Sequence, residues 1–568
     1  MNKLRLTLIF ASIALTSCYR DDFFELKNPP EFPWQSVKEF EMAVVAPYNK
    51  YFFGDWGGSY MTDRVIRDGM TEILYLIPGS AEDFPHDEIY YRSTNIRNTR
   101  ADQCFANGYK AINNLNSSMD FFYNPERYFS DPTKHPFYNL SSSKQLELHR
   151  QIGEMHIFRA FCYFQHLIRH CPSPGSSGYS SKAVLPFRKD WTFNADSMRH
   201  PEIVSAKKIM DEIIIPDLRV ARAWLPNQYT AANHPSYQYG RPAKYAAYGI
   251  SARIFFYLGN ESYTMTDGTS FNPWDSALIY SEAVINSGIY NLNEEPIKAF
   301  NRSTASLAAE SIWDVIHYNT EYKDAPWDAT LFTWNHGNVV TSNPDYLAAM
   351  PYGSVPAQRD DDSLYLMDVR KHRCTWHVFS MSFSTAQYID WIDASDSSQT
   401  LNATMDKRFK QLYLYVKPAP LIEDEVINAS PFILYDNKNT WVRRPQIWCN
   451  KYFRGAQGDL TNVPVLRLPE MYLTAAIIEK INGKNDGGLS KTNTIRVRAG
   501  LGALGAVTEE DIHKERIKEL AFEGDWLIYL YGLRKNIGPG DRVDRSEIPI
   551  GDDRLQWQLP LEETQFYE

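Results

Sequence analysis

The sequence is poor in cysteine and has no excess of basic residues. It holds 6 Cys among 568 residues, too few and too widely spaced for a disulfide scaffold. Its 59 Lys and Arg stand against 69 Asp and Glu, which gives a formal charge of −10. Nucleic-acid binding needs a basic surface that neutralises phosphates, so we expect no nucleic-acid partner. Because 43% of the residues are hydrophobic, intrinsic disorder is excluded too.

Catalytic motifs are also missing. The chain has no Gly-x-Ser-x-Gly turn, phosphate-binding loop, His-Glu-x-x-His motif or EF-hand loop. Asp360–Asp362 could offer carboxylates to calcium, but a solvated acidic turn explains it more simply. Cys162, His166, His170 and Cys171 place thiols and imidazoles at helical spacing and could bind a metal. A position in the core explains them more simply. We therefore predict no catalytic residue, no metal site and no cofactor, with structural calcium left open.

The N-terminus predicts export and lipidation. Lys3 and Arg5 precede an apolar run, Leu6–Leu15, that is too short to span a bilayer. The run leads into Leu15-Thr16-Ser17-Cys18, a lipobox, although an ordinary cleaved signal with a chance cysteine is the alternative. We predict a signal peptide at 1–17, acylation of Cys18, and a proline-containing extended tether at 18–36. The acyl chains would anchor the mature protein to a membrane.

Helices are predicted by apolar residues at helical spacing and by end signals. The clearest has Asn272 as N-cap, Pro273 at its first position and Gly288 as its stop. Thr508 caps another helix ahead of three acidic residues, and Pro216 is expected to kink a third. The predicted stretches are 154–169, 203–224, 242–258, 272–288, 469–481 and 508–522.

These helices are expected to pair as antiparallel hairpins resembling tetratricopeptide repeats. Ala252, Ala277 and Ala283 are candidate crossing positions. The spacing departs from a regular repeat of about 34 residues, so insertions must separate the pairs. The longest interval, 318–450, mixes short apolar runs such as 411–416 with Pro, Asn, Asp and Gly, which favours loops and short strands. The predicted fold class is mainly α with an irregular, loop-rich half.

Aromatic residues are abundant: 36 Tyr, 30 Phe and 14 Trp in a chain whose mean hydropathy is −0.44. Many rings should therefore have polar or exposed surroundings. Rings stack on the apolar faces of sugars, while nearby Asp, Asn and Arg hydrogen-bond to hydroxyls. Three ring-rich loops fit this chemistry, with local packing as the alternative for each. The candidate ligand-binding residues are Asp55, Trp56, Asp83, Tyr91, Tyr322, Trp327 and Trp334.

Several blocks, in order along the chain and behind the lipobox, resemble the SusD/RagB family of outer-membrane nutrient-binding lipoproteins. One ends in Arg-Ala-x-x-Tyr-Phe, another starts a helix with Gly-Arg-x-x-Lys, and a third ends a helix with Val-Ile-x-Ser-Gly-x-Tyr. The blocks are Gly153–Phe164, Gly240–Arg253, Trp274–Tyr290, Glu310–Trp313, Leu466–Glu470, Ile495–Leu501 and Glu515–Gly524. The stretch after the last block, Trp526–Arg534, follows the family pattern only loosely.

The resemblance implies a SusD-like domain over 37–568, with an N-terminal part at about 37–260 and a C-terminal SusD/RagB part at about 261–568. It implies four tetratricopeptide-like hairpins beside an irregular ligand-binding half. It also implies a lipid-anchored protein on the outside of the outer membrane. There it would capture oligosaccharide as a lid on a SusC-like TonB-dependent transporter.

Three alternatives remain open at this point. A member of the same family could bind oligopeptides, because aromatic loops serve either ligand. A surface glycoside hydrolase could use paired carboxylates about 5–10 Å apart, which a sequence cannot reveal. A purely structural lid would need no ligand contact of its own.

Overall fold

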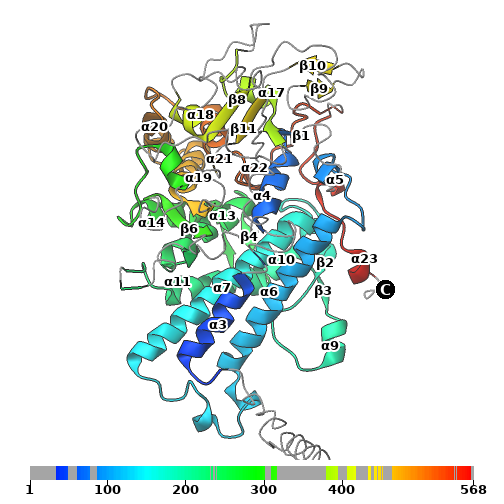
Figure 1. Ribbon diagram of the computed structural model, residues 1–568, viewed down its shortest axis with the longest axis vertical. Helices are drawn as coiled ribbons and strands as arrows, with labels where there is room; N and C mark the ends of the chain where they lie inside the picture. Colours follow the sequence, from blue (N-terminus) through cyan, green and yellow to red (C-terminus); the bar gives the residue numbers. More distant parts are fainter. Residues whose placement is uncertain are drawn as a thin grey trace, which may run out of the picture.

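A computed structural model gives the fold of the chain, which is dominated by helices (Figure 1). The predicted mainly helical class is confirmed. The pairing of the helices as four tetratricopeptide-like hairpins stays a prediction, and residues 1–33, with Cys18, lie outside the described part. The structure describes residues 34–48, 51, 60–76, 86–300 except 231, 234–236, 238 and 239, 309–315, 379–393, 406–416, 433–435, 441–443, 446–449, 451, and 463–564 except 543 and 545.

The longest helix, α7 (Ser142–His170), forms the centre of the N-terminal half. The sequence predicts one apolar stripe facing a core, but every residue from 150 to 170 is buried. The reason is that α3 (Val37–Tyr48), α6 (Thr99–Tyr123) and α11 (Ile215–Trp224) pack around it on several sides. Figure 1 shows α3, α6 and α7 lying side by side.

The predicted helix at 203–224 is divided by its proline. It begins as strand β3 (Ile203–Ser205), becomes helical in α10 (Ala206–Ile209), and passes through a π-helical turn, η4 (Met210–Ile214), into α11. Pro216 has no backbone N–H, and its ring would clash with the carbonyl four residues earlier in a regular α-helix. The wider π turn accommodates this proline, so the expected kink takes the form of a local change in helical winding.

The predicted helices of the C-terminal half begin within about two residues of their expected starts, but the helix that begins at Pro273 ends at Ile285, before the expected stop at Gly288. Two further helices, at 489–498 and 526–533, lie outside the predicted stretches. Asn272 accepts from the backbone N–H of Asp275 at 3.1 Å, and Gly483 has the left-handed φ of 59° that favours glycine. Thr508 and Asp511 form a reciprocal capping box. These helices are α13 (Lys244–Leu258), α14 (Pro273–Ile285), α19 (Leu468–Asn482), α20 (Leu489–Arg498), α21 (Glu509–Leu520) and α22 (Trp526–Leu533).

Short antiparallel strands make up the described part of the irregular half. A four-stranded sheet at the top of Figure 1 has the order β1-β7-β11-β8. The predicted apolar run 411–416 becomes β8 only from Tyr413 onward, because α18 continues to Leu412. The sheet strands are β1 (Leu74–Leu76), β7 (Phe379–Met381), β8 (Tyr413–Val416) and β11 (Gln446–Cys449).

The remaining strands form two-stranded pairs. They are β2 (Ala183–Pro186) with β3, β4 (Tyr263–Thr264) with β5 (Ser270–Phe271), β6 (Ser311–Val315) with β12 (Val463–Arg467), and β9 (Ile433–Tyr435) with β10 (Trp441–Arg443). The other α-helices are α4 (Tyr60–Gly69), α5 (His86–Tyr90), α8 (Gly178–Ser181), α9 (Ala195–Arg199), α17 (Phe383–Tyr388), α18 (Lys407–Leu412) and α23 (Leu561–Thr564). Within the described ranges, no helix combines the length and apolar character needed to cross a bilayer.

A buried network of charges joins the elements of the C-terminal half. At its centre, the guanidinium of Arg467 donates to Glu310 at 3.0 Å, to Glu519 at 2.6 Å and to Glu523 at 2.7 and 2.9 Å. Arg498 also pairs with Glu519, at 2.6 Å. Additional pairs extend the network to α18 and to the residues after β11: Arg408 with Glu515 at 2.8 Å, and Lys451 with Glu523 at 2.7 Å.

The network lowers the pKa of two of its acids, whereas burial raises the pKa of a third, Glu310, although Arg498 and Arg467 oppose that shift. Burial alone would raise the pKa of Glu519, but Arg498, Arg467 and Arg408 lower it far below its usual range. The pKa of Glu523 is lowered in the same way by Arg467 and Lys451, against the effect of burial. A carboxyl whose pKa is lower in the folded chain stabilises the fold above its unfolded pKa and loses that contribution as the pH falls.

We predict that Arg467→Met destabilises the protein by about 3–5 kcal/mol, because it leaves buried carboxylates without their cation. Urea unfolding at neutral pH measures the change. Lys208→Met is the matched control, since Lys208 pairs with Glu202 at a solvent-exposed site and should cost less than about 1 kcal/mol. In the wild type, stability should begin to fall as the pH drops below about 4.5. Equal effects of the two substitutions would contradict the proposed importance of the network.

We also predict that Gly524→Ala destabilises the protein by about 2 kcal/mol or more. Gly524 has a φ of 73°, and an added Cβ would lie 2.6 Å from the backbone oxygen of Arg64. Gly505→Ala is the control, because a Cβ at Gly505 meets open space. Thermal unfolding of both variants checks the difference, and a tolerated Gly524→Ala would show that α4 can move away.

Candidate functional site

One of the seven candidate ligand-binding residues, Tyr91, lies in the described part of the chain. The others fall in segments 52–59, 77–85 and 316–378, which lie outside the described residues. These are Asp55, Trp56, Asp83, Tyr322, Trp327 and Trp334, and they stay predictions. The described elements show where these segments join the fold.

Two of the three segments join the sheet at neighbouring positions. Strands β1 and β7 are antiparallel, and Leu76 is paired with Phe379. The chain therefore leaves toward 77–85 and returns from 316–378 at paired positions, whose Cα atoms are about 5 Å apart in such a ladder. Segment 52–59 instead follows Tyr51, a buried residue whose ring lies 5.4 Å from that of Phe158 on α7.

Tyr91 lies beside this end of the sheet and is 56% exposed. Its ring is edge-on to that of Tyr90, with centroids 5.0 Å apart. Tyr90 is buried, and its ring lies 6.3 Å from the ring of Phe379 on β7. Burial raises the pKa of the Tyr91 phenol, an effect that Asp87 adds to and Arg542 opposes. Tyr91 thus offers an exposed ring and a protonated hydroxyl at neutral pH.

Arg542 fixes the support of Tyr91. Its guanidinium lies 4.0 Å from the centroid of the Tyr90 ring. It also donates to the backbone oxygens of Tyr90 at 3.1 Å and of Thr71 at 2.8 Å, and to that of Gly69. Arg542 therefore ties α5 to the connection between α4 and β1, so the position of Tyr91 depends on a residue near the other end of the chain.

A second partly exposed ring, Tyr388, ends α17, which follows β7 directly. Asp541 caps the start of α17 by accepting from the backbone N–H groups of Phe383 and Ser384. The ammonium of Lys514 lies 5.4 Å from the centroid of the Tyr388 ring. Tyr388 is not among the residues predicted from the sequence, because nothing in its local sequence separates it from the other tyrosines. Rings and charged groups flanking β7 can stack on a ligand and hydrogen-bond to it.

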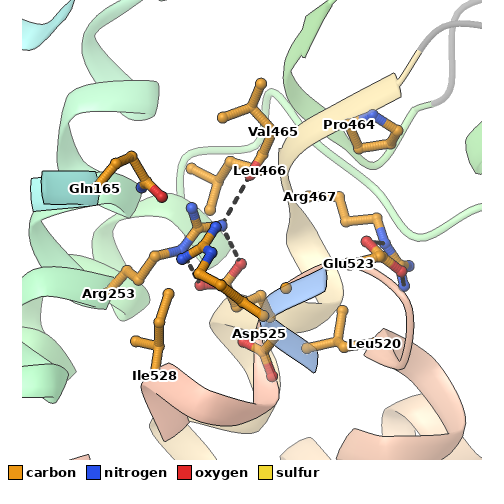
Figure 2. Close-up of a pocket in the computed structure, with 13 residues that line it drawn as sticks. Gln165, Arg253, Pro464, Val465, Leu466, Arg467, Leu520, Glu523, Asp525 and Ile528 are labelled. Carbon is orange, nitrogen blue, oxygen red and sulfur yellow. Dashed lines mark hydrogen bonds and ion pairs between the residues drawn. The ribbon is translucent and has the colours of Figure 1, made fainter. Parts of the chain in front are cut away.

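A polar pocket lies deeper in the molecule, between α13, β12, α19 and α22 (Figure 2). Arg253 crosses it and pairs with Glu470 at 2.6 and 2.8 Å, while donating to the backbone oxygen of Val465. The cavity has a volume of about 10 Å³, which is room for about one water molecule. The amide of the buried Gln165 points toward this space in Figure 2. The pocket is too small for a sugar, so it belongs to the scaffold.

Asp68 holds the segment that borders this pocket. Its carboxylate accepts from the backbone N–H groups of Gly524 at 3.0 Å and of Trp526 at 3.2 Å. Burial raises the pKa of Asp68 to about 7, although these two hydrogen bonds oppose the shift. The role of the carboxyl is to connect α4 with the end of the Glu515–Gly524 block.

The thiols and imidazoles of α7 are packed into the core. The ring of His166 lies 5.4 Å from that of Phe105 and 4.6 Å from that of Tyr109, both on α6. Burial lowers the pKa of His166 well below its usual value, with a further contribution from Arg169. Cys162 and Cys171 are buried, as are Cys104 and Cys449. Among the described residues, no three metal-binding side chains come together, and Asp360–Asp362 lies outside that part.

The chain is similar over nearly its whole length to several solved structures. A SusD superfamily protein from Bacteroides thetaiotaomicron has 14% identity and a TM-score of 0.66, with 93% of this chain and 98% of that chain covered. A SusD-like carbohydrate binding protein from Bacteroides vulgatus has 15% identity and a TM-score of 0.64, with 94% and 97% covered. Surface glycan-binding protein A from Bacteroides uniformis has 16% identity and a TM-score of 0.56, with 93% and 95% covered.

At sequence identities this low, the structural similarities establish only the fold. A search of curated protein sequences gives no match. The sequence model of the SusD family, by contrast, matches residues 227–527, more than half of the chain. This range includes most of the blocks on which the resemblance was based and the center of the buried charge network. The chain therefore belongs to the SusD family.

Proposed function

We propose that this protein is a cell-surface glycan-binding lipoprotein that captures oligosaccharide or polysaccharide and delivers it to a SusC-like TonB-dependent transporter, on which it acts as a lid. The observation that carries the proposal is the family match over residues 227–527. The lipobox at Cys18 supports attachment to the outer membrane, facing the exterior.

The chemistry around Tyr91 supports a sugar ligand. An exposed ring on a support fixed by Arg542 can stack on a sugar with little loss of conformational freedom. The paired positions Leu76 and Phe379 connect the segments that contain Asp83 and Trp327 to the same end of the sheet. Stacking and hydrogen bonding suffice for capture, so the proposal includes no catalytic residue.

Capture of oligopeptides by the same surface is the second candidate, and a surface glycoside hydrolase is a less favoured third. Two similar structures are described as carbohydrate- or glycan-binding proteins, which favours the sugar. A purely structural lid would bind neither ligand on its own.

We predict that residues 19–568 migrate more slowly in native gels containing the correct polysaccharide. Plant, fungal, bacterial and host glycans should be compared. Tyr91→Ala and Trp327→Ala should each weaken retardation by about fivefold to a hundredfold, the equivalent of about 1–3 kcal/mol for a lost ring contact. Ile279→Ala is the matched control, since Ile279 is 62% exposed on α14.

The outcomes separate the candidates. Retardation that the Tyr91 and Trp327 variants lose and the Ile279 variant keeps supports glycan capture. Tryptophan quenching by peptides without retardation by any glycan favours oligopeptide capture. Release of shortened products from a retarding glycan indicates a hydrolase, and binding of neither ligand class leaves the structural lid.

We also predict that Cys18→Ser abolishes acylation. Cells fed a labelled fatty acid should label the wild-type protein and not the variant, which lacks the thiol that receives the lipid. The variant should leave the outer-membrane fraction, and the SusC-like transporter should co-purify with the wild type. Equal labelling of both proteins would rule out lipidation at Cys18.

A further inference from the structure

The end of the molecule where the described chain begins carries a group of rings that the glycan site does not use. We call it the aromatic end and define it by Tyr123, Tyr128, Tyr138, Trp191 and Phe193. Tyr123 is the last residue of α6, and Phe193 lies two residues before the start of α9. Figure 1 shows α9 in the lower part of the molecule, away from the four-stranded sheet. Phe193 is 61% exposed, Tyr138 56% and Tyr123 45%. So much exposed aromatic surface in one region indicates an interface.

The aromatic end rests on a rigid base. Phe121 is buried, and its ring lies 5.1 Å from that of Tyr128, which in turn lies 5.7 Å from that of Phe193. The ring of Trp191 lies 6.3 Å from the ring of Phe193. The guanidinium of Arg127 lies 4.9 Å from the centroid of the same ring. The exposed ring of Phe193 is therefore held in place by packing before any partner arrives.

Several polar groups beside these rings are already engaged within the protein. Tyr128 donates to Asp120 at 2.7 Å, and the Tyr123 hydroxyl lies 2.8 Å from Nε2 of His156. Arg127 donates to Asp120 and to the backbone oxygen of Trp191. A sugar site needs polar groups that turn toward hydroxyls, whereas rings with satisfied neighbours suit the boundary between water and lipid, where Trp and Tyr concentrate.

The position of the tether indicates which surface is within reach. The described chain starts at Trp34, whose ring lies 5.2 Å from that of Phe121 in the same cluster. Cys18 is 16 residues earlier, a distance of at most about 55 Å for a fully extended chain. A lipid attached at Cys18 would therefore keep the aromatic end close to the membrane that holds it. Such tethering makes even a weak surface contact effective, because the contact becomes intramolecular.

The charge of this end permits contact with anionic headgroups. Residues 123–145 and 188–200 contain six Lys and Arg and four Asp and Glu, in a chain whose formal charge is −10. The acidic surplus of the whole chain is thus absent here. Basic side chains near an anionic lipid surface add to the affinity that buried rings provide.

We propose that the aromatic end docks on the lipid surface that holds the acylated Cys18, with Trp191 and Phe193 at the level of the headgroups. The inference rests on the lipidation included in the proposed function. It adds a second, reversible contact to the covalent anchor and orients the domain relative to the membrane.

Vesicle sedimentation tests the docking in the absence of the acyl chains. Residues 19–568, which retain every described residue, are mixed with vesicles of phosphatidylcholine containing about 30% phosphatidylglycerol, an anionic surface. Weak binding that rises with lipid concentration is expected. The double variant Trp191→Ala/Phe193→Ala should bind about tenfold more weakly, because the exposed ring of Phe193 and the half-buried ring of Trp191 no longer enter the interface. Ile279→Ala, which removes a side chain of similar exposure elsewhere, should bind as the wild type does.

Thermal unfolding confirms that the double variant is folded, and glycan retardation should be unchanged in it because the aromatic end lies away from the sheet (Figure 1). No binding by the wild type at the highest lipid concentration, or equal binding by the wild type and the double variant, overturns the proposal. Equal binding by the two proteins is also the result expected if the aromatic end contacts the transporter instead of the lipid. If no glycan retards the wild type, this is a separate failure, which concerns the proposed function alone.

Discussion

The buried position of Arg467 constrains the rest of the C-terminal half. Removing a guanidinium from water costs several kcal/mol, which is offset only when carboxylates meet it with good geometry. Those carboxylates come from Glu310 before β6, from Glu519 on α21 and from Glu523 after it. Strand β12, strand β6 and helix α21 therefore have one arrangement in which the charge is satisfied. Lys451 and Arg408 bring β11 and α18 into the same arrangement.

The same principle explains the blocks that mark the family in this sequence. Glu154 in one block pairs with Arg241 in the next, at 2.9 Å, and Arg253 pairs with Glu470, 217 residues further along the chain. The blocks thus supply both members of buried ion pairs that join distant segments. Their charged residues belong to the scaffold, which is why they identify the fold without identifying the ligand.

The features that could be predicted from the sequence are those that depend on residues close together in the chain. The caps at Asn272 and Thr508 act within one helical turn, so their positions follow from local chemistry. The burial of α7 on every side from residue 150 to 170 and the support of Tyr91 do not follow from local chemistry. Tyr91 could be selected from its polar and aromatic neighbours, but Arg542, which binds the backbone of Tyr90, is 452 residues away from that tyrosine. Pairings between residues so far apart in the chain follow no spacing rule. The pairing of Leu76 with Phe379 is another example.

The burial of α7 on several sides also sets the order in which an exported chain can fold. A chain crossing a membrane emerges from its N-terminus, so α7 appears before α11 and α13, which end at Trp224 and Leu258. About a hundred residues must follow the start of α7 before these partners are available. Until then its apolar surface faces water or a chaperone that shields it. Export of the chain as proposed above would therefore include an interval in which one side of its central helix is uncovered, and a chaperone would have to keep the chain from aggregating during that interval.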